Sequence, residues 1–119
     1  MGGTFTNLLY HVVFSTKNRE PIILDAFQYR LYKFIGGIIR EKGGILLSIG
    51  GTEDHVHLAV RLKPVEAVST TIGKLKGNSS KWINEQRLLN GHFSWQVGFG
   101  AFSVSESQLQ SVVKYIESQ

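Results

Sequence analysis

Two histidines stand one residue apart in the run EDHVHLAV at residues 53–60. If this run is a strand, alternate side chains share a face, so His55 and His57 lie together and the apolar residues between them point the other way. Two imidazoles on one face can reach a single divalent cation, and the small Ala59 leaves space beside them, but two ligands are an incomplete metal site. The alternative is that both histidines are half-exposed strand residues without a metal. Against it, the apolar Val-Leu-Val stripe already supplies the buried face of the strand, so packing gives no reason for two histidines on the other face.

Residues beside this pair are candidates for completing a metal site. Glu53 and Asp54 precede the histidines, and either carboxylate could bind the cation or accept a hydrogen bond from an imidazole N–H. His11, in another predicted strand, and His92, in a predicted turn, are further candidates. For these two, ordinary strand and loop roles are favoured.

A tyrosine near the end of the chain is a candidate nucleophile. The last predicted helix has an apolar stripe of Leu109, Val112, Val113 and Ile116. At about 100° per residue, Tyr115 lies about 110° from the centre of that stripe and is not needed to bury the helix. Gln119 follows one turn later on the same side. A phenol beside a cation held by two imidazoles and a neutral oxygen could attack a phosphodiester, whereas a tyrosine that only flanks the helix is the alternative.

The elements that must position these residues can be predicted in order along the chain. Strands are predicted over residues 4–15, 45–49, 55–62 and 95–104, the last interrupted by Gly98 and Gly100. A first helix is predicted over residues 26–42, with Asp25 as N-cap and Gln28 bonding back. Pro64 can begin a second helix, which Gly77 interrupts. Residues 79–89 then either continue this helix or form a separate one. Ser105 is predicted to cap the last helix, with Gln108 completing a capping box.

This order, β-α-β-β-α-β followed by an extra helix, predicts an α+β fold of the ferredoxin-like split β-α-β type. Its antiparallel sheet would carry two helices on one face. With 119 residues, the chain is long enough for one domain and one core. Because two helices cover only one face of a sheet, the face with the histidines is left for a ligand, a partner or a second subunit.

Charge and composition narrow the functional class. Thirteen Lys and Arg against nine Asp and Glu give a net charge of +4, which favours a nucleic-acid partner. The candidate phosphate contacts are Lys17 and Arg19 after the first strand, and Lys76 and Lys81 in the second helix. The absence of cysteine excludes disulfides, thiolate metal sites and a cysteine nucleophile. No apolar run approaches the roughly 18 residues of a membrane span, and no secretory signal begins the chain, so a cytoplasmic, nucleoid-associated protein without membrane contact is expected.

Four segments of the chain resemble one known family. They are YHVVFSTKNR at 10–19, DHVHL at 54–58, KGNSSK at 76–81 and GFGAFSVS at 98–105, the last leading to Tyr115. Together they cover nearly the whole chain in the order found in the single-tyrosine HUH transposases of small bacterial and archaeal insertion sequences. A His-x-His pair alone is a weak signal, but this series is specific.

The resemblance implies a function for the chain and a role for each of its parts. It implies one transposase catalytic domain over residues 1–119, with a ferredoxin-like core at 1–104 and a mobile tyrosine helix at 105–119. Such a domain cuts and rejoins single-stranded DNA with Mg²⁺ or Mn²⁺, leaving a 5′-phosphotyrosine and a free 3′-OH. By position, His55 and His57 match the metal-binding histidines, Gln119 the third metal ligand, and Tyr115 the nucleophile.

The resemblance also implies partners. Family members bind single-stranded DNA with subterminal hairpins and form homodimers through their sheets, in which the tyrosine helix of one subunit can complete the histidine site of the other. Gly98 and Gly100 would then give that helix a pliable tether. Family members usually continue with a charged segment beyond the position of Gln119, whereas this sequence stops there. The expected third ligand is then the last residue of a helix end that can fray.

Two other functions are compatible with the sequence. A ferredoxin-like protein that binds nucleic acid without catalysis, as a domesticated or truncated relative, is the main alternative. A replication-initiator nickase would share the chemistry, but the small size of the chain and the lack of a helicase domain disfavour it.

Overall fold

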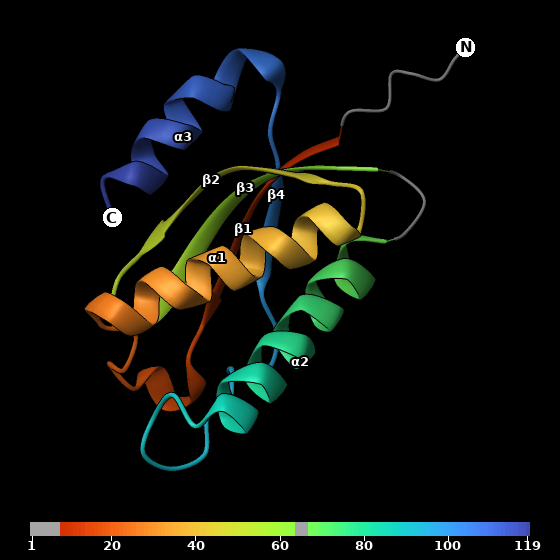
Figure 1. The fold of residues 1–119 in the computed structure, drawn as a ribbon. Coiled ribbons are helices and arrows are strands. Elements are labelled where there is room, and N and C mark those ends of the chain that lie inside the picture. Colours follow the sequence, from red (N-terminus) through yellow and green to blue (C-terminus); the bar gives the residue numbers. More distant parts are fainter. Residues whose placement is uncertain (1–7, 64–66) are drawn as a thin grey trace.

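The computed structural model describes residues 8–63 and 67–119. One four-stranded antiparallel sheet has two long helices on one face and a shorter helix on the other (Figure 1). The strands are β1 (Leu8–Ser15), β2 (Ile45–Gly51), β3 (His55–Leu62) and β4 (Gly100–Ser103), and the helices are α1 (Asp25–Glu41), α2 (Val68–Gln86) and α3 (Leu109–Glu117). Short 3-10 turns at Lys17–Arg19 and Glu106–Gln108 follow β1 and precede α3.

The sheet has the strand order β2-β3-β1-β4. Strand β3 is antiparallel to both β1 and β2, so it lies between the two strands that α1 connects. This is the split β-α-β arrangement, and the predicted ferredoxin-like fold is confirmed. The hairpin of β2 and β3 places the two histidines on the central part of the sheet, where β1 pairs with β3 from Leu8↔Leu62 to Ser15↔His55.

The core lies between the sheet and the helix pair α1 and α2. Val56, Leu58 and Val60 of β3 are fully buried there, as alternation along a strand requires. They pack with a cluster of apolar helix residues: Leu31, Ile35, Ile38 and Ile39 from α1, and Ile72, Leu75 and Ile83 from α2. The predicted separation of the two strand faces is therefore correct, and both histidines are on the face away from this core.

The opposite face of the sheet is covered in part by α3 of the same chain. This helix lies across β2 and β3 on the side away from α1 (Figure 1). Ile116 is fully buried, and its backbone comes so close to Gly50 of β2 that a Cβ on Gly50 would lie 3.1 Å from the Ile116 carbonyl carbon. The face predicted to be open for a ligand or a partner is thus partly occupied by the helix that carries the tyrosine.

The start of α1 differs from the prediction. Asp25 is the first residue of the helix, at φ 22°, and the N-cap is Leu24, which has no side-chain cap. The Leu24 carbonyl accepts the hydrogen bond from the Gln28 amide at 3.0 Å. The backbone just before the helix is fixed because buried Ile23 donates its N–H to the Glu53 carbonyl at 2.8 Å. With the backbone fixed there, the helix begins at Asp25, one residue earlier than predicted.

The second helix is continuous through Gly77 to Gln86, which confirms the alternative in which the helix continues and rules out a separate helix after Gly77. A Cβ at Gly77 would meet nothing within 4 Å, which puts this residue on the solvent side. The buried stripe through Leu75, Ser79 and Ile83 holds the helix together, and glycine costs only about 1 kcal/mol of propensity there. Pro64 and Val65, predicted at the start of this helix, lie outside the described residues, as do residues 4–7 of the first predicted strand.

The fourth predicted strand is shorter than expected. Only Gly100–Ser103 is a strand, while Trp95 makes an isolated bridge to Thr16. Between them Gly98 has φ 88°, a backbone conformation that side chains disfavour. Ser105 is the N-cap of the 3-10 turn that leads into α3 and forms the predicted capping box with Gln108, whereas the N-cap of α3 itself is Gln108. In the described part of the chain, no helix is long and apolar enough to cross a membrane.

Candidate active site

The histidines and the tyrosine meet between the sheet and α3. His57 is only 6% exposed, and the centroid of its ring lies 5.6 Å from that of Tyr115, edge to face. The rings of His55 and His57 are 4.9 Å apart. Tyr115 is 52% exposed, so its ring contacts the histidine cluster while remaining accessible to solvent. The structure therefore brings together three of the residues that the sequence predicted for the site.

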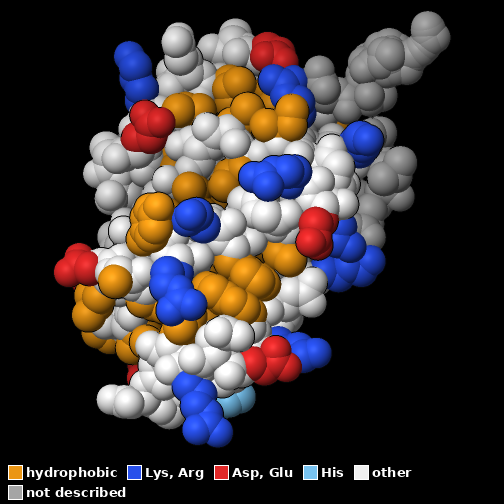
Figure 2. All heavy atoms as spheres, viewed as in Figure 1, with side chains coloured by type: hydrophobic (Ala, Val, Ile, Leu, Met, Phe, Trp, Pro, Cys, Tyr) orange, Lys and Arg blue, Asp and Glu red, His pale blue; other side chains and the backbone are white. Residues whose placement is uncertain are grey.

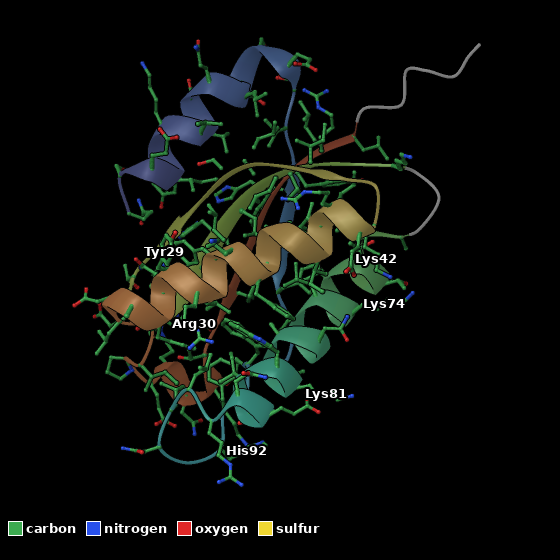
Figure 3. All side chains as sticks on the ribbon, in the orientation of Figure 1. Tyr29, Arg30, Lys42, Lys74, Lys81 and His92 are labelled. Atoms are coloured by element: carbon green, nitrogen blue, oxygen red, sulfur yellow. The ribbon has the colours of Figure 1, made fainter. Side chains whose placement is uncertain are left out.

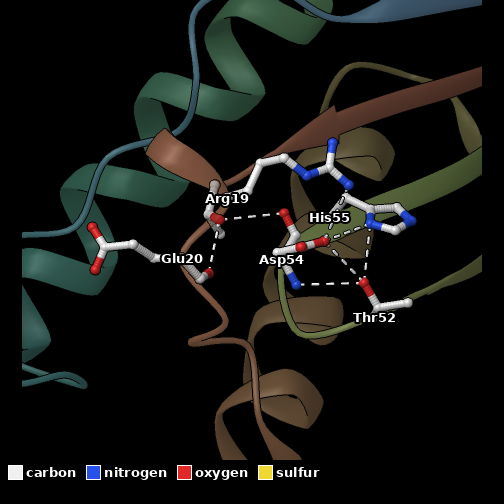
Figure 4. A network of polar contacts seen from close by, with 6 residues as sticks. Arg19, Glu20, Thr52, Asp54 and His55 are labelled. Atoms are coloured by element: carbon white, nitrogen blue, oxygen red, sulfur yellow. Dashed lines mark hydrogen bonds and ion pairs between the residues drawn. The ribbon is translucent and has the colours of Figure 1, made fainter.

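His55 is held by the turn before its strand. Its Nδ1–H donates to Asp54 Oδ1 at 2.7 Å, and Thr52 Oγ1 lies 3.0 Å from the same nitrogen (Figure 4). The hydrogen bond from His55 is the main cause that holds the pKa of Asp54 below its usual value. Because the Asp54 carboxylate only accepts, the proton of a neutral His55 is on Nδ1, which leaves Nε2 as a lone pair.

Asp54 thus occupies the position predicted for an acceptor beside a metal-binding imidazole. The other predicted carboxylate, Glu53, is exposed, and its backbone carbonyl rather than its side chain makes the contact to Ile23. Arg19 extends from the 3-10 turn after β1 toward Asp54 (Figure 4), and its Nη2 lies 3.6 Å from Asp54 Oδ1. The turn and the strand end therefore form one polar network around His55.

His57 has a partner that the sequence did not reveal. His11 Nε2, on the neighbouring strand β1, lies 2.9 Å from His57 Nδ1, and the two rings stack with centroids 5.1 Å apart. Burial lowers the pKa of His57 to about 4, helped by the charges of His55 and His11, and burial also lowers the pKa of His11. Both imidazoles are therefore neutral at pH 7. The sequence interpretation favoured an ordinary strand role for His11, because no local pattern links it to His57, 46 residues away.

Gln119 is not joined to the histidines in this arrangement. Its amide nitrogen donates to the carbonyl of Tyr115 at 3.1 Å, one turn back on α3. Within the described residues, no hydrogen bond connects Gln119 to His55 or His57. Its role as a third ligand remains a prediction that requires the side chain to turn from its own helix.

The donor set fits a divalent cation in part. Nδ1 of both His55 and His57 is engaged by a neighbour, which leaves the two Nε2 atoms as potential ligands, the usual arrangement of metal-binding histidines. Over residues 8–63 and 67–119, no group of three or more His, Cys, Asp or Glu side chains is arranged to hold a metal ion. A cation held by the two imidazoles would need a further ligand of another kind, such as the amide oxygen of Gln119, substrate or water.

The basic residues predicted to contact DNA have different environments. Lys17 and Lys81 are exposed, and Lys81 points outward from α2 (Figure 3). Lys and Arg side chains stand out across the face formed by α1 and α2, among apolar and a few acidic side chains (Figure 2). Lys76 instead donates to the carbonyls of Gln96 and Gly98, at 2.6 and 2.5 Å, and burial lowers its pKa. Lys76 fixes the loop before β4.

Lys76 and Lys81 also border a cavity of about 620 Å³ between α2 and residues 92–99. His92 lies at the edge of this cavity, in the loop after α2 (Figure 3), and makes no hydrogen bond or ring contact with the histidine pair among the described residues. Its predicted role as an ordinary loop residue is consistent with this position.

Comparisons with known proteins agree on one family. Residues 4–119 match the family model described as Transposase IS200 like. The ISDra2 transposase TnpA of Deinococcus radiodurans is 26% identical over 123 residues, which cover 98% of this chain and 87% of that protein. The IS200 transposase of Salmonella typhimurium is 33% identical over 84 residues, which cover 67% of this chain but only 53% of that protein.

Two solved structures have the same fold. A candidate transposase from Deinococcus radiodurans, solved at 1.90 Å, gives a TM-score of 0.79 at 25% identity, over 100% of this chain and 95% of that one. A REP-associated tyrosine transposase bound to a REP hairpin gives a TM-score of 0.70 at 17% identity, over 98% of this chain and 68% of that one. The second likeness shows the fold alone.

Proposed function

Because the chain belongs to the family of IS200-like transposases, we propose that it cuts and rejoins single-stranded DNA through a covalent 5′-phosphotyrosine formed by Tyr115. One observation carries this proposal: the ring of Tyr115 lies 5.6 Å from that of His57, on the face of the sheet where the His55 and His57 side chains meet. Of the four tyrosines in the chain, Tyr115 is the one on the helix that covers this face.

The proposed reaction conserves the number of phosphoester bonds. The phenolic oxygen of Tyr115 loses its proton and attacks the phosphorus of a phosphodiester, the new O–P bond forms, and the bond to the 3′ oxygen breaks. That oxygen takes up a proton and becomes a free 3′-OH. In the reverse direction, the 3′-OH of another strand attacks the phosphotyrosine and releases the phenol. Water is not consumed, so the broken strand can be rejoined without an external energy source.

A divalent cation fits this chemistry. His55 and His57 would hold Mg²⁺ or Mn²⁺, with Gln119 as the proposed third ligand, and such an ion when bound withdraws charge from a phosphodiester oxygen. The protein contributes two preorganised features: the Asp54 contact that orients His55, and burial that keeps His57 neutral at pH 7. Neutral imidazoles are the form that binds metal.

The substrate is proposed to be single-stranded DNA with subterminal hairpins. Support comes from the net charge of +4, from the basic side chains on the α1 and α2 face (Figure 2), and from the hairpin bound to a protein of the same fold. Lys17, Arg19 and Lys81 are the proposed phosphate contacts, with Lys76 acting through the loop that it holds. The proposed assembly is a homodimer joined through the sheets, whose active sites can be composite if α3 exchanges between subunits.

The test is a covalent adduct assay. The protein is incubated with single-stranded DNA from the ends of its insertion sequence and Mn²⁺, then resolved under denaturing conditions. We expect an adduct from wild type and from Tyr29→Phe, whose tyrosine is exposed on α1 (Figure 3), but none from Tyr115→Phe. An adduct from Tyr115→Phe refutes the assignment of the nucleophile. DNA binding without any wild-type adduct favours instead a non-catalytic nucleic-acid-binding protein.

A further inference from the structure

His11 has a geometry that goes beyond an ordinary strand residue. We propose that His11 is a positioning residue for His57: its Nε2 accepts the Nδ1–H of His57, which fixes the tautomer and orientation of His57 so that Nε2 is presented as the metal-binding lone pair. This inference rests on the proposed function, because it assigns a purpose to His57. It adds a fourth residue, from a different strand, to the site of His55, His57 and Tyr115.

The pairing of β1 with β3 places His11 where this contact is possible. His11 is directly opposite Ala59, and Val13 is directly opposite His57, so all four side chains share the face under α3. His11 is therefore a diagonal neighbour of His57, within reach of an aromatic side chain. Because Ala59 is small, the His11 ring can turn along the strand toward His57. The two rings stack with their centroids 5.1 Å apart.

His55, the other histidine of the pair, is oriented in the same way. Asp54 Oδ1 accepts from Nδ1 of His55 at 2.7 Å, and His11 Nε2 lies 2.9 Å from Nδ1 of His57. In both cases a neighbour engages Nδ1 and leaves Nε2. A neighbour that accepts from the second ring nitrogen is the common way in which proteins fix a metal-binding imidazole. His11 thus does for His57 what Asp54 does for His55, without placing a second carboxylate under α3.

The direction of the His11 to His57 hydrogen bond follows from this role. One proton lies between the two nitrogens, and a His57 that binds a cation through Nε2 must keep its proton on Nδ1. His57 is then the donor, and His11 is the acceptor with its own proton on Nδ1. The opposite direction would put the proton of a neutral His57 on Nε2 and block that nitrogen as a ligand.

Packing holds His11 in this orientation from three sides. Besides stacking on His57, its ring contacts Phe102 of β4, at 6.2 Å, and Tyr115 of α3, at 6.0 Å between centroids. A side chain that served only to fill this space would not need a nitrogen. The proposal therefore separates two properties of His11: its shape, which phenylalanine can supply, and its acceptor atom, which glutamine can supply.

The first test is spectroscopic and requires no metal or DNA. Long-range ¹H–¹⁵N correlation spectra of the metal-free protein at pH 7 distinguish Nδ1–H from Nε2–H imidazoles. We expect the Nδ1–H tautomer for both His57 and His11, and a His57 resonance that loses this pattern in His11→Phe. A wild-type His57 in the Nε2–H form would overturn the proposal.

The second test measures the affinity for Mn²⁺ alone by calorimetry. We expect His11→Phe to weaken binding by about 10- to 100-fold, the range for loss of such a neighbour, and His11→Gln to recover most of it. His92→Phe, at an exposed loop position, is the matched control and should bind as wild type does. If His11→Phe binds Mn²⁺ as tightly as wild type, the proposal is wrong.

Failure of the proposed function gives a different result. A wild-type protein that binds no Mn²⁺, or binds it equally well after His57→Ala, would remove the proposed cation site, and the tautomer of His57 alone would then decide the role of His11. A protein that binds Mn²⁺ through His57 and is insensitive to His11→Phe would retain the proposed function and remove only the role of His11.

Discussion

Substituting Gly50 with alanine should undock the tyrosine helix while the core stays folded. A Cβ at this position would lie 3.1 Å from the carbonyl carbon of Ile116 and 3.3 Å from its Cγ2, and nearer still to the carbonyl oxygen, at a separation that real Cβ atoms essentially never show. The two nearest of these atoms belong to the backbone of α3, which cannot turn aside as a flexible side chain can. The helix must therefore move away from β2.

The energetic effect can be worked from what α3 buries. Ile116 is fully buried, and complete burial of such a side chain contributes about 1.5–3 kcal/mol. A withdrawal of about 0.5–1 Å already removes a quarter to a half of each dispersion contact, so we expect docking to weaken by about 0.4–1.5 kcal/mol. The core between the sheet and α1 and α2 does not include Ile116 and should keep its stability.

Amide hydrogen exchange is the assay. A loss of about 1.4 kcal/mol corresponds to a tenfold change, so amides of residues 112–117 should exchange roughly 2- to 13-fold faster in Gly50→Ala, with little change for β1 and β3. Gly73→Ala is the matched control, because a Cβ there meets nothing within 4 Å. Equal exchange of α3 in wild type and Gly50→Ala would refute the close approach of the helix to β2.

Three further outcomes are expected. Burial lowers the pKa of His57 to about 4, below its ordinary value of 6.5, so between these values the folded state binds fewer protons than the unfolded state. The contribution of His57 to the free energy of unfolding is therefore complete above about pH 6.5 and falls toward pH 4, by at most about 3 kcal/mol. Urea unfolding at about pH 7 and about pH 4.5 should show a smaller difference in the free energy of unfolding for His57→Gln than for wild type. The buried Trp95 N–H donates to Ser79 Oγ at 2.9 Å, and Ser79→Ala removes this acceptor. The substitution should lower the free energy of unfolding by about 1–3 kcal/mol, and no change would mean that the indole N–H finds another partner. Lys81→Ala should weaken binding of single-stranded DNA and reduce the salt slope by about one, and an unchanged slope would remove Lys81 from the phosphate contacts.

The sequence predicted the fold because its local patterns agree with one another. Alternation in β3 separated Val56, Leu58 and Val60 from the two histidines, and the structure places these sets on opposite faces as predicted. Helical periodicity likewise placed Ile116 on the buried side of α3 and Tyr115 beside it. These patterns depend on neighbours within one element, which is why they can be read from the sequence.

The features that were missed depend on residues far apart in the chain. His11 meets His57 through strand pairing, and Lys76 finds the carbonyls of Gln96 and Gly98 across a loop, so neither contact has a local signal. The predicted Asp25 cap failed because the hydrogen bond from Ile23 to Glu53 fixes where α1 begins. Tertiary contacts of this kind override local preferences.

The position and polarity of the covalent bond between protein and DNA test the proposed mechanism most directly. Single-stranded substrate labelled at either end is cleaved by wild-type protein with Mn²⁺, and the adduct is digested with trypsin and sequenced by mass spectrometry. The mechanism predicts that the peptide containing Tyr115 carries the 5′-phosphoryl group of the downstream fragment, and that the upstream fragment is released with a free 3′-OH. A DNA fragment on any other residue, a 3′-phosphoryl linkage, or cleavage with both fragments free of protein would contradict it.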